Sequence, residues 1–338
     1  MRNAAKIITV AVPTRIDLAG GTLDIPPLFL WHWPAPVINA AISIMVSVRI
    51  KHSRSFVIIS RDQGISATFR NWESLKVAGH KKLELLIRLA RYFPVKANIS
   101  IEVDSEAPAG SGLGASSAIA VALAAALARW TSRRLSRAEI IEYAKSAETQ
   151  TIKVPTGYQD YWAASYGGMK AYETGLNGRL KQASIGSKTF LKEFEEHLLL
   201  VYTGKPHFSG ANNWELFKRR VDGDKDMVAF FSALQKSAHQ MRKAVAGGHI
   251  KQVAEALNDD WAIRKSMLPS MTTPAIERLS RTAFRGGALG FRVCGAGGGG
   301  CALILVPPNK RAGLKKEIEK NDMRILPAKI VGKSIIFR

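Results

Sequence analysis

The sequence predicts an α+β protein of two domains, on three observations. The chain has 338 residues, more than one hydrophobic core needs and fewer than three would need. Its β-rich runs and helical patterns are segregated and do not alternate strictly, which is typical of α+β folds. The composition, with 46% hydrophobic and 22% charged residues, is that of a globular protein. We expect one domain over residues 1–170 and another over residues 171–338, with the boundary near residues 165–180.

The elements expected in the first half lead to a glycine-rich loop. Residues 37–50 and 56–60 are rich in β-branched side chains and predict strands. Residues 80–93 carry apolar side chains at helical spacing, and residues 97–103 alternate as a strand does. The glycine-rich loop comes next and precedes an alanine-rich helix. A capping-box pattern at Ser136 then opens a further helix.

The chain changes character beyond Gly167 and Gly168, which mark a break. In order, we expect a strand at 197–203, several helices between about 211 and 285, strands at 288–293 and 301–306 joined by a glycine loop, a lysine-rich helix and a last strand. The second half therefore also mixes helices and strands without strict alternation.

The composition bears on partners and on location. A formal charge of +22 is compatible with nucleic acid, an anionic membrane or anionic substrates. The positive residues are scattered and no RNA-type aromatic motif interleaves with them, which favours a basic solvated surface. No run of about 18 uncharged apolar residues predicts a membrane span. The two cysteines, Cys294 and Cys301, have neither disulfide-framework nor zinc spacing, so we expect reduced thiols in a cytoplasm.

The most informative motif is the glycine-rich loop, PAGSGLGASSA at residues 108–118. Its glycines remove side chains where backbone must approach a ligand. Ser116 and Ser117 open the following helix, whose N–H groups and dipole suit a phosphate. A hydroxyl there can also reach a phosphate-bound Mg²⁺. The Walker A lysine and the full dinucleotide fingerprint are both missing. The pattern thus indicates another kind of phosphate loop, with a tight turn as the alternative.

Three further segments carry residues that could do chemistry. PTRIDLAGGTLD (13–24) places an arginine, a glycine pair and an aspartate beside a predicted strand. GYQDYWAASYGG (157–168) places Asp160 among aromatic and small residues, where an acid is either hydrogen-bonded structure or a poised base. Either segment by itself is equally compatible with a structural role. CGAGGGGC (294–301) is too rich in glycine for simple packing and favours close approach to a ligand or another loop.

In this order and spacing, the four segments resemble the GHMP kinase superfamily of galactokinase, homoserine kinase, mevalonate kinase and phosphomevalonate kinase, over essentially the whole chain. The opening AVPTRIDLAGGTLDIPP, the later VINAAI and the pair Gln159 and Asp160 look most like the D-glycero-D-manno-heptose 7-phosphate kinase branch. The resemblance implies an N-terminal domain like ribosomal protein S5 domain 2, carrying the ATP phosphate loop, and a ferredoxin-like α+β C-terminal domain. It also implies ATP-dependent phosphorylation of a hydroxyl on a sugar or sugar phosphate.

The resemblance further implies a role for individual residues. Asp160 matches the catalytic aspartate that accepts or orients the substrate hydroxyl proton, and Arg15 matches the cation beside it. Ser116 and Glu148 match the Mg²⁺ ligands. The implied ATP loop consists of Pro108, Gly110, Ser111, Gly112, Leu113, Gly114, Ser116 and Ser117. The implied acceptor contacts are Asp24, Gly20, Gly21, Lys205, Gly297 and Gly298, with the 295–300 loop packed beside the phosphate loop.

Two departures from the family pattern concern the acceptor. Heptose kinases tend to read GGGTD where this chain reads GGTLD, so Leu23 adds an apolar group near the pocket. The family also tends to carry an arginine in a TGxxR segment, where this chain has His207 and, as a replacement cation, Lys205. The acceptor therefore stays open between a heptose 7-phosphate, a free sugar and a non-sugar alcohol. A nucleic-acid-binding protein is the alternative from a different class.

Overall fold

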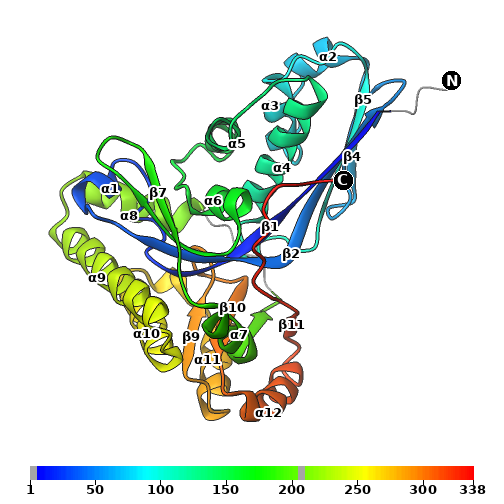
Figure 1. The fold of residues 1–338 in the computed structure, drawn as a ribbon. Coiled ribbons are helices and arrows are strands. Elements are labelled where there is room, and N and C mark those ends of the chain that lie inside the picture. Colours follow the sequence, from blue (N-terminus) through cyan, green and yellow to red (C-terminus); the bar gives the residue numbers. More distant parts are fainter. Residues whose placement is uncertain (1–5, 205–209) are drawn as a thin grey trace.

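The computed structural model describes residues 6–204 and 210–338. Within these residues the strands form two separate sheets, one of eight strands and one of four, and helices cover both (Figure 1). This arrangement confirms the predicted α+β class. The larger sheet comes mainly from the first half of the chain and the smaller sheet from the second half.

The larger sheet is built on two long strands, β1 (Ile7–Ala19) and β2 (Val37–His52), which pair antiparallel along most of their lengths. The other strands of this sheet are β3 (Phe56–Ser60), β4 (Ile65–Phe69), β5 (Ile99–Ser105), β6 (Met169–Thr174), β7 (Leu180–Ser184) and β12 (Ile336–Phe337). Their order is β12-β1-β2-β5-β3-β4, with β6 paired to β2 and β7 to β6. The register of β1 on β2 shifts once in the middle of β1, at Pro13 and Thr14, and once near its end, and such irregularities re-aim side chains.

The helices of the first half are α1 (Leu28–Trp31), α2 (Trp72–Val77), α3 (Glu84–Arg91), α4 (Ala115–Trp130), α5 (Arg137–Ile152) and α6 (Gln159–Tyr166). Helix α4 is buried along most of its length, because its many alanines let the helix lie close to β1 and β2. Helix α5 begins with the predicted capping box, in which Ser136 and Glu139 exchange hydrogen bonds. The glycine-rich loop therefore joins β5 to a buried helix, as the sequence predicts.

The smaller sheet contains β8 (Leu198–Tyr202), β9 (Gly290–Val293), β10 (Cys301–Leu305) and β11 (Arg324–Leu326) in the order β11-β8-β10-β9, all antiparallel. Its helices are α7 (Lys188–His197), α8 (Gly210–Val221), α9 (Lys225–Gly247), α10 (Ile250–Met267), the 3₁₀ turn η1 (Pro269–Met271), α11 (Pro274–Arg285) and α12 (Pro308–Glu319). The long helices α9 and α10 lie side by side (Figure 1).

Strand pairing continues across residue 170, near which we expect the boundary between the two domains. After the glycine pair, β6 and β7 continue the larger sheet as far as Ser184. Strand β12, near the C-terminus, pairs with β1 of the first half. Figure 1 shows the red segment that leads from the smaller sheet, at β11, back to the larger sheet. The pattern of a strand predicts its own conformation but not its partner, so these pairings are not visible in the sequence.

A shared apolar core joins the two halves. Ile16 on β1 and Ile38 on β2 are buried in the same cluster as Met241 on α9, Leu257 on α10 and Leu303 on β10. The C-terminal part of β1 therefore lies at the junction of the halves, and this part carries the arginine predicted to act in the site.

Candidate functional site

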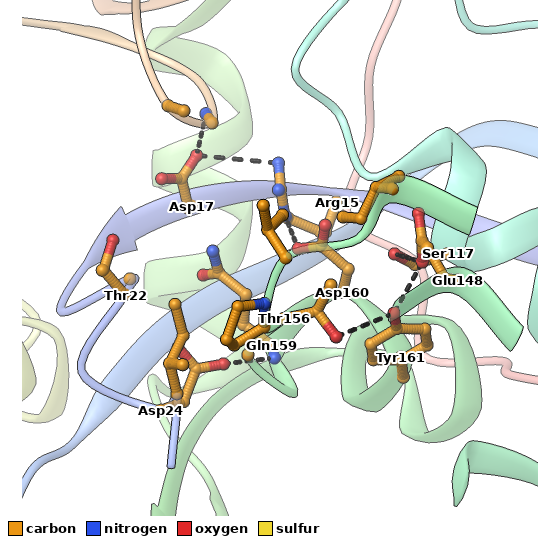
Figure 2. A pocket seen from close by; sticks show the side chains of 18 of the residues that line it. Arg15, Asp17, Thr22, Asp24, Ser117, Glu148, Thr156, Gln159, Asp160 and Tyr161 are labelled. Carbon is orange, nitrogen blue, oxygen red and sulfur yellow. Dashed lines mark hydrogen bonds and ion pairs between the residues drawn. The ribbon is translucent and has the colours of Figure 1, made fainter. Parts of the chain in front are cut away.

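The candidate site lies where β1, the glycine-rich loop and α6 meet, between two neighbouring cavities, the first of which is drawn in Figure 2. The first, which we call the acceptor cavity, is bordered by Gly21, Asp24 and Gln159 among others. The second, the loop cavity, is bordered by the glycine-rich loop from Pro108 to Ser117. Six of the described residues border both cavities: Arg15, Ser117, Glu148, Ile152, Asp160 and Gly295. The predicted catalytic pair thus lies on the border between the cavities.

The carboxylate of Asp160 is held directly by Arg15. The Nε of Arg15 donates a hydrogen bond of 2.7 Å to Oδ1 of Asp160. The arginine side chain is 4% exposed, whereas that of Asp160 is 24% exposed. The loop also lies close to this carboxylate, since a Cβ on Gly114 would lie only 3.0 Å from Cγ of Asp160. The carboxylate is therefore held by Arg15 and remains partly exposed to the cavities.

Arg15 also ties the glycine-rich loop to β1. Its backbone N–H donates to the carbonyl of Leu113 at 3.0 Å, and its Nη1 donates to the carbonyl of Gly112. Burial alone would lower the pKa of Arg15, but the carboxylates of Asp160 and Asp17 outweigh this effect and raise the pKa. The guanidinium therefore stays charged throughout the working range of proteins.

The glycine loop at residues 295–300 packs against the glycine-rich loop, as expected. The N–H of Cys301 donates to the carbonyl of Ser111 at 2.8 Å. A Cβ on Gly112 would lie 2.5 Å from the carbonyl oxygen of Cys294, and the φ of Gly112 is +73°. Both the backbone conformation and the close approach thus require glycine at this position.

We expect Gly112→Ala to destabilise the protein by about 1–3 kcal/mol beyond the strain of the left-handed backbone, because the methyl group must displace the facing loop. Gly64→Ala is the matched control, since Gly64 has a φ of +63° and no atom of the described residues lies within 4 Å of an added Cβ. Urea unfolding of both variants measures the difference. Equal losses in the two variants would contradict the close contact between the loops.

Glu148 is a buried carboxylate between the loop and α6. It is 6% exposed and accepts hydrogen bonds of 2.6 Å from Ser117 Oγ and from the Tyr161 hydroxyl (Figure 2). Burial raises its pKa, hydrogen bonds from Ser116, Ser117 and Tyr161 partly offset the rise, and the charge of Asp160 adds to it. Ser116 is exposed and Ser117 is buried, and both border the loop cavity.

Asp24 performs two tasks at the acceptor cavity. Its Oδ2 accepts hydrogen bonds from the backbone N–H groups of Tyr158 and Gln159, the latter at 2.7 Å, and so holds the start of α6. Burial raises the pKa of Asp24, although these two hydrogen bonds act in the opposite direction. Its Oδ1 is buried and has no hydrogen-bond partner among the described residues. A ligand donor at that oxygen would remove the cost of an unpaired buried acceptor.

The other predicted acceptor contacts differ in their placement. Gly21 borders the acceptor cavity. Gly20 turns away instead, and its N–H donates to Asp260 at 3.3 Å. Gly297 and Gly298 pack on Met271 of η1, where the N–H of Gly298 donates to the carbonyl of Met271 at 2.6 Å. Lys205 lies outside the described residues.

Sequence reasoning missed Arg264, which borders the acceptor cavity from α10. Its Nε donates to Asp260 Oδ2 at 2.7 Å and its Nη2 to the carbonyl of Gly21 at 2.6 Å. The i,i+4 spacing of Asp260 and Arg264 was the one available signal, and this spacing is also typical of ordinary surface helices. The second half thereby contributes a charged side chain to the cavity.

Two features are absent from residues 6–204 and 210–338. No helix there is long and apolar enough to cross a membrane. No group of three or more histidine, cysteine, aspartate or glutamate side chains there has the geometry of a metal site.

Two protein-family models match this chain and define its class. The model of the GHMP kinases N terminal domain matches residues 81–168, and that of the GHMP kinases C terminal matches residues 241–323. Together they cover about half of the chain. The chain therefore belongs to the GHMP kinases, which transfer phosphate to a hydroxyl group. The family predicted from the four segments is confirmed.

Individual relatives are similar over nearly the whole chain. A D-glycero-alpha-D-manno-heptose 7-phosphate kinase of Campylobacter jejuni is 28% identical over 93% of this chain and 94% of its own length. An L-fucokinase/L-fucose-1-P guanylyltransferase of Bacteroides fragilis is 24% identical over 91% of this chain but 36% of its own length. A crystal structure of a D-glycero-D-manno-heptose 1-phosphate kinase from Bacteroides thetaiotaomicron superposes with a TM-score of 0.79 at 20% identity, over 98% of both chains, and so shares the fold.

Proposed function

We propose that the protein transfers the γ-phosphate of ATP to a hydroxyl of a sugar or sugar phosphate, with a heptose 7-phosphate as the leading candidate. The observation that carries the proposal is the Arg15–Asp160 pair on the border between the acceptor cavity and the loop cavity. The similarity to the Campylobacter jejuni heptose 7-phosphate kinase over nearly full length supports the choice of acceptor.

In this proposal each cavity holds one substrate. The ATP phosphates lie on the loop from Pro108 to Ser117 and at the N-terminal end of α4, whose N–H groups and dipole favour anions. The acceptor hydroxyl lies at Asp160, which takes its proton as the hydroxyl oxygen attacks the γ-phosphorus in line. Arg15 stabilises the negative charge that develops there. Free Oδ1 of Asp24 accepts a hydrogen bond from a sugar hydroxyl.

The residues around Glu148 fit a Mg²⁺ ion bound together with the nucleotide. The carboxylate is buried and forms no ion pair with another described residue, so a cation would compensate its charge. Mg²⁺ usually takes one or two carboxylates plus substrate phosphates and water. Glu148 and the hydroxyl of Ser116 would hold the ion, and Ser117 would orient the carboxylate. When bound, Mg²⁺ neutralises charge on the transferred phosphate group.

The raised pKa of Glu148 leads to a pH-dependent affinity for Mg²⁺. Only the ionised carboxylate binds the ion, and a raised pKa extends proton competition to higher pH than for an ordinary glutamate. We therefore expect the Mg²⁺ concentration for half-maximal activity to rise as the pH falls toward this pKa. In Glu148→Gln, Mg²⁺ binding should be weaker and this pH dependence lost. Unchanged Mg²⁺ titrations in Glu148→Gln and Ser116→Ala would place the metal elsewhere.

An ATP-consumption screen over hexoses, heptoses and their phosphates tests the proposed function. A heptose 7-phosphate with the highest kcat/KM would support the leading candidate. Mevalonate or homoserine as the best acceptor would instead make the protein a kinase of non-sugar alcohols. Steeply salt-dependent binding of RNA or duplex DNA, without phosphorylation of any acceptor, would favour a nucleic-acid-binding protein.

One observation favours a free sugar as the second candidate. The arginines that border the acceptor cavity, Arg15 and Arg264, are already paired with Asp160 and Asp260 among the described residues. A phosphate on the acceptor would need a further cation, and the candidate is Lys205, outside the described part of the chain. Lys205→Ala should then raise KM for the sugar phosphate alone. A higher kcat/KM for an uncharged sugar, with Lys205→Ala silent, would favour the free-sugar kinase.

The two cysteines support a location in the cytoplasm. Cys294 and Cys301 are free and buried, and burial raises the pKa of both thiols, which keeps them protonated and unreactive. Two unpaired thiols beside the substrate loop suit a reducing cytoplasm.

A further inference from the structure

Behind Arg15 lies a buried chain of alternating charges that links the two halves. Asp17, two residues along β1, has its Oδ1 3.7 Å from Arg15 Nη1. Its Oδ2 accepts a hydrogen bond from Arg292 Nη2 on β9. Arg292 Nη1 in turn donates to Asp260 Oδ2 on α10 at 2.5 Å, and Asp260 also pairs with Arg264. This series of charged side chains thus runs from Arg15 in the first half to Arg264, at the wall of the acceptor cavity, in the second half.

The middle of this chain is completely removed from solvent. The side chain of Arg292 is 0% exposed and that of Asp17 is 1% exposed. Burial by itself would raise the pKa of Asp17, but Arg292 first, and then Arg15 and Arg264, outweigh burial and lower the pKa. The carboxylate therefore remains ionised. The three arginines are matched by three carboxylates once Asp160 is included.

Arg292 binds these partners through the two terminal nitrogens of its planar guanidinium group. Besides the two carboxylates, its Nη1 donates to the carbonyl of Leu18 at 2.8 Å. A planar guanidinium can serve two carboxylates and a carbonyl together, whereas the point charge of a lysine cannot. Asp17 is held at its other oxygen by the N–H of Gly295, at 3.0 Å, in the glycine loop. Arg292 and Gly295 thus leave Asp17 one position, and that position faces Arg15.

We propose that Arg292 is a positioning residue for phosphate transfer, which holds Asp17 and through it keeps Arg15 in place against Asp160. The proposal rests on the catalytic roles proposed for Arg15 and Asp160. A buried ion pair is weak evidence for stability, because apolar side chains of similar size often serve equally well. The Arg292–Asp17 pair lies directly next to Arg15, and we infer that this position is the functional reason for the pair. The second half, by this reasoning, orients a side chain that belongs to the first.

Arg292→Lys tests the proposal because it keeps the positive charge but removes the planar guanidinium group. A small displacement of a catalytic group can cost about 10²-fold in rate, so we expect kcat to fall by about that factor. KM for ATP should rise less than in Arg15→Met, since the contact of Arg15 with the Gly112 carbonyl is loosened and not removed. Arg311→Lys is the control: Arg311 on α12 also anchors a backbone carbonyl, that of Leu198 at 2.9 Å, and it borders neither cavity. Its kcat should not change.

A double-mutant cycle separates positioning from a general structural role. In an Arg15→Met background, the side chain that Arg292 positions is gone, so Arg292→Lys should lower kcat by no more than about threefold further. A loss as large as in the wild-type background would overturn the proposal. An Arg15→Met variant with unchanged kcat would instead refute the catalytic role proposed for Arg15, so the two failures are distinguishable.

A readout that needs no acceptor decides the matter if no sugar is phosphorylated or if activity is too low to compare. The Nε–H of Arg15 is hydrogen-bonded to Asp160 and gives its own signal in an arginine side-chain NMR spectrum, assigned with the Arg15→Met variant. We expect this proton to exchange slowly in the wild type and at least about tenfold faster in Arg292→Lys. Unchanged exchange would overturn the proposal. If Arg292→Lys does not fold, Asp260→Asn removes the neighbouring anchor and is measured in the same way.

Discussion

Replacing Asp160 with asparagine is expected to lower kcat by about 10²- to 10⁴-fold, the usual contribution of a general base. The amide keeps the size of the carboxylate but cannot accept the proton of the substrate hydroxyl. It also removes the charge that Arg15 contacts at 2.7 Å. Binding of ATP should change little, because the phosphates lie on the loop and not on this carboxylate. Steady-state kinetics with ATP and the best acceptor of the screen measure both quantities.

The control for Asp160→Asn is Asp104→Asn, at an exposed position near the end of β5. Its kcat should equal that of the wild type. An Asp160→Asn enzyme that retains most of its kcat would remove Asp160 from the mechanism. In that case the proton would have to leave by another route, and the Arg15–Asp160 pair would be a structural ion pair.

Arg15→Met is expected to lower kcat by about 10²- to 10³-fold, the typical cost of losing one group that stabilises charge in a transition state. Methionine fills much of the buried space but leaves the developing charge on the hydroxyl oxygen unmatched. It also releases the carbonyl of Gly112, so KM for ATP should rise moderately. Single-turnover measurements separate the chemical step from nucleotide binding.

Arg15→Lys is the informative companion variant. A lysine can restore the charge beside Asp160, but one ammonium group cannot also hold the Gly112 carbonyl in the geometry of the guanidinium. Its kcat should lie between those of the wild type and Arg15→Met. Equal kcat values for the lysine and methionine variants would mean that geometry, and not charge, is what Arg15 supplies.

The local parts of the site could be predicted from the sequence, because each lies within a short motif. The glycine-rich loop, the helix after it and the aspartate of α6 are contiguous segments with their own conformational requirements. Gly112 and Gly114 have positive φ, and Ser136 caps α5, as the local patterns require. The meeting of these segments in one site follows from the family resemblance and not from any single pattern.

The parts that could not be predicted depend on contacts between distant segments. Arg292 is 275 positions from Asp17, its partner, and nothing in the GFRV strand distinguishes a buried arginine from a solvated one. Arg264 likewise looks like part of a polar helix face. Strand β12 is two residues long and pairs with β1 at the opposite end of the chain. Local periodicity carries no information on such partners.

The return of the chain through β12 changes the mechanics of the molecule. The polypeptide crosses between the two sheets once after β7 and again before β12, where the N–H of Val331 donates to the carbonyl of Ala41 at 3.0 Å. A single connecting segment would let the two sheets both twist and bend relative to each other. Two separate connecting segments allow relative rotation only about the line that joins them. Together with the apolar core that both halves share, the two connections therefore oppose rotation of one sheet against the other and help to keep Arg292 in contact with Asp17.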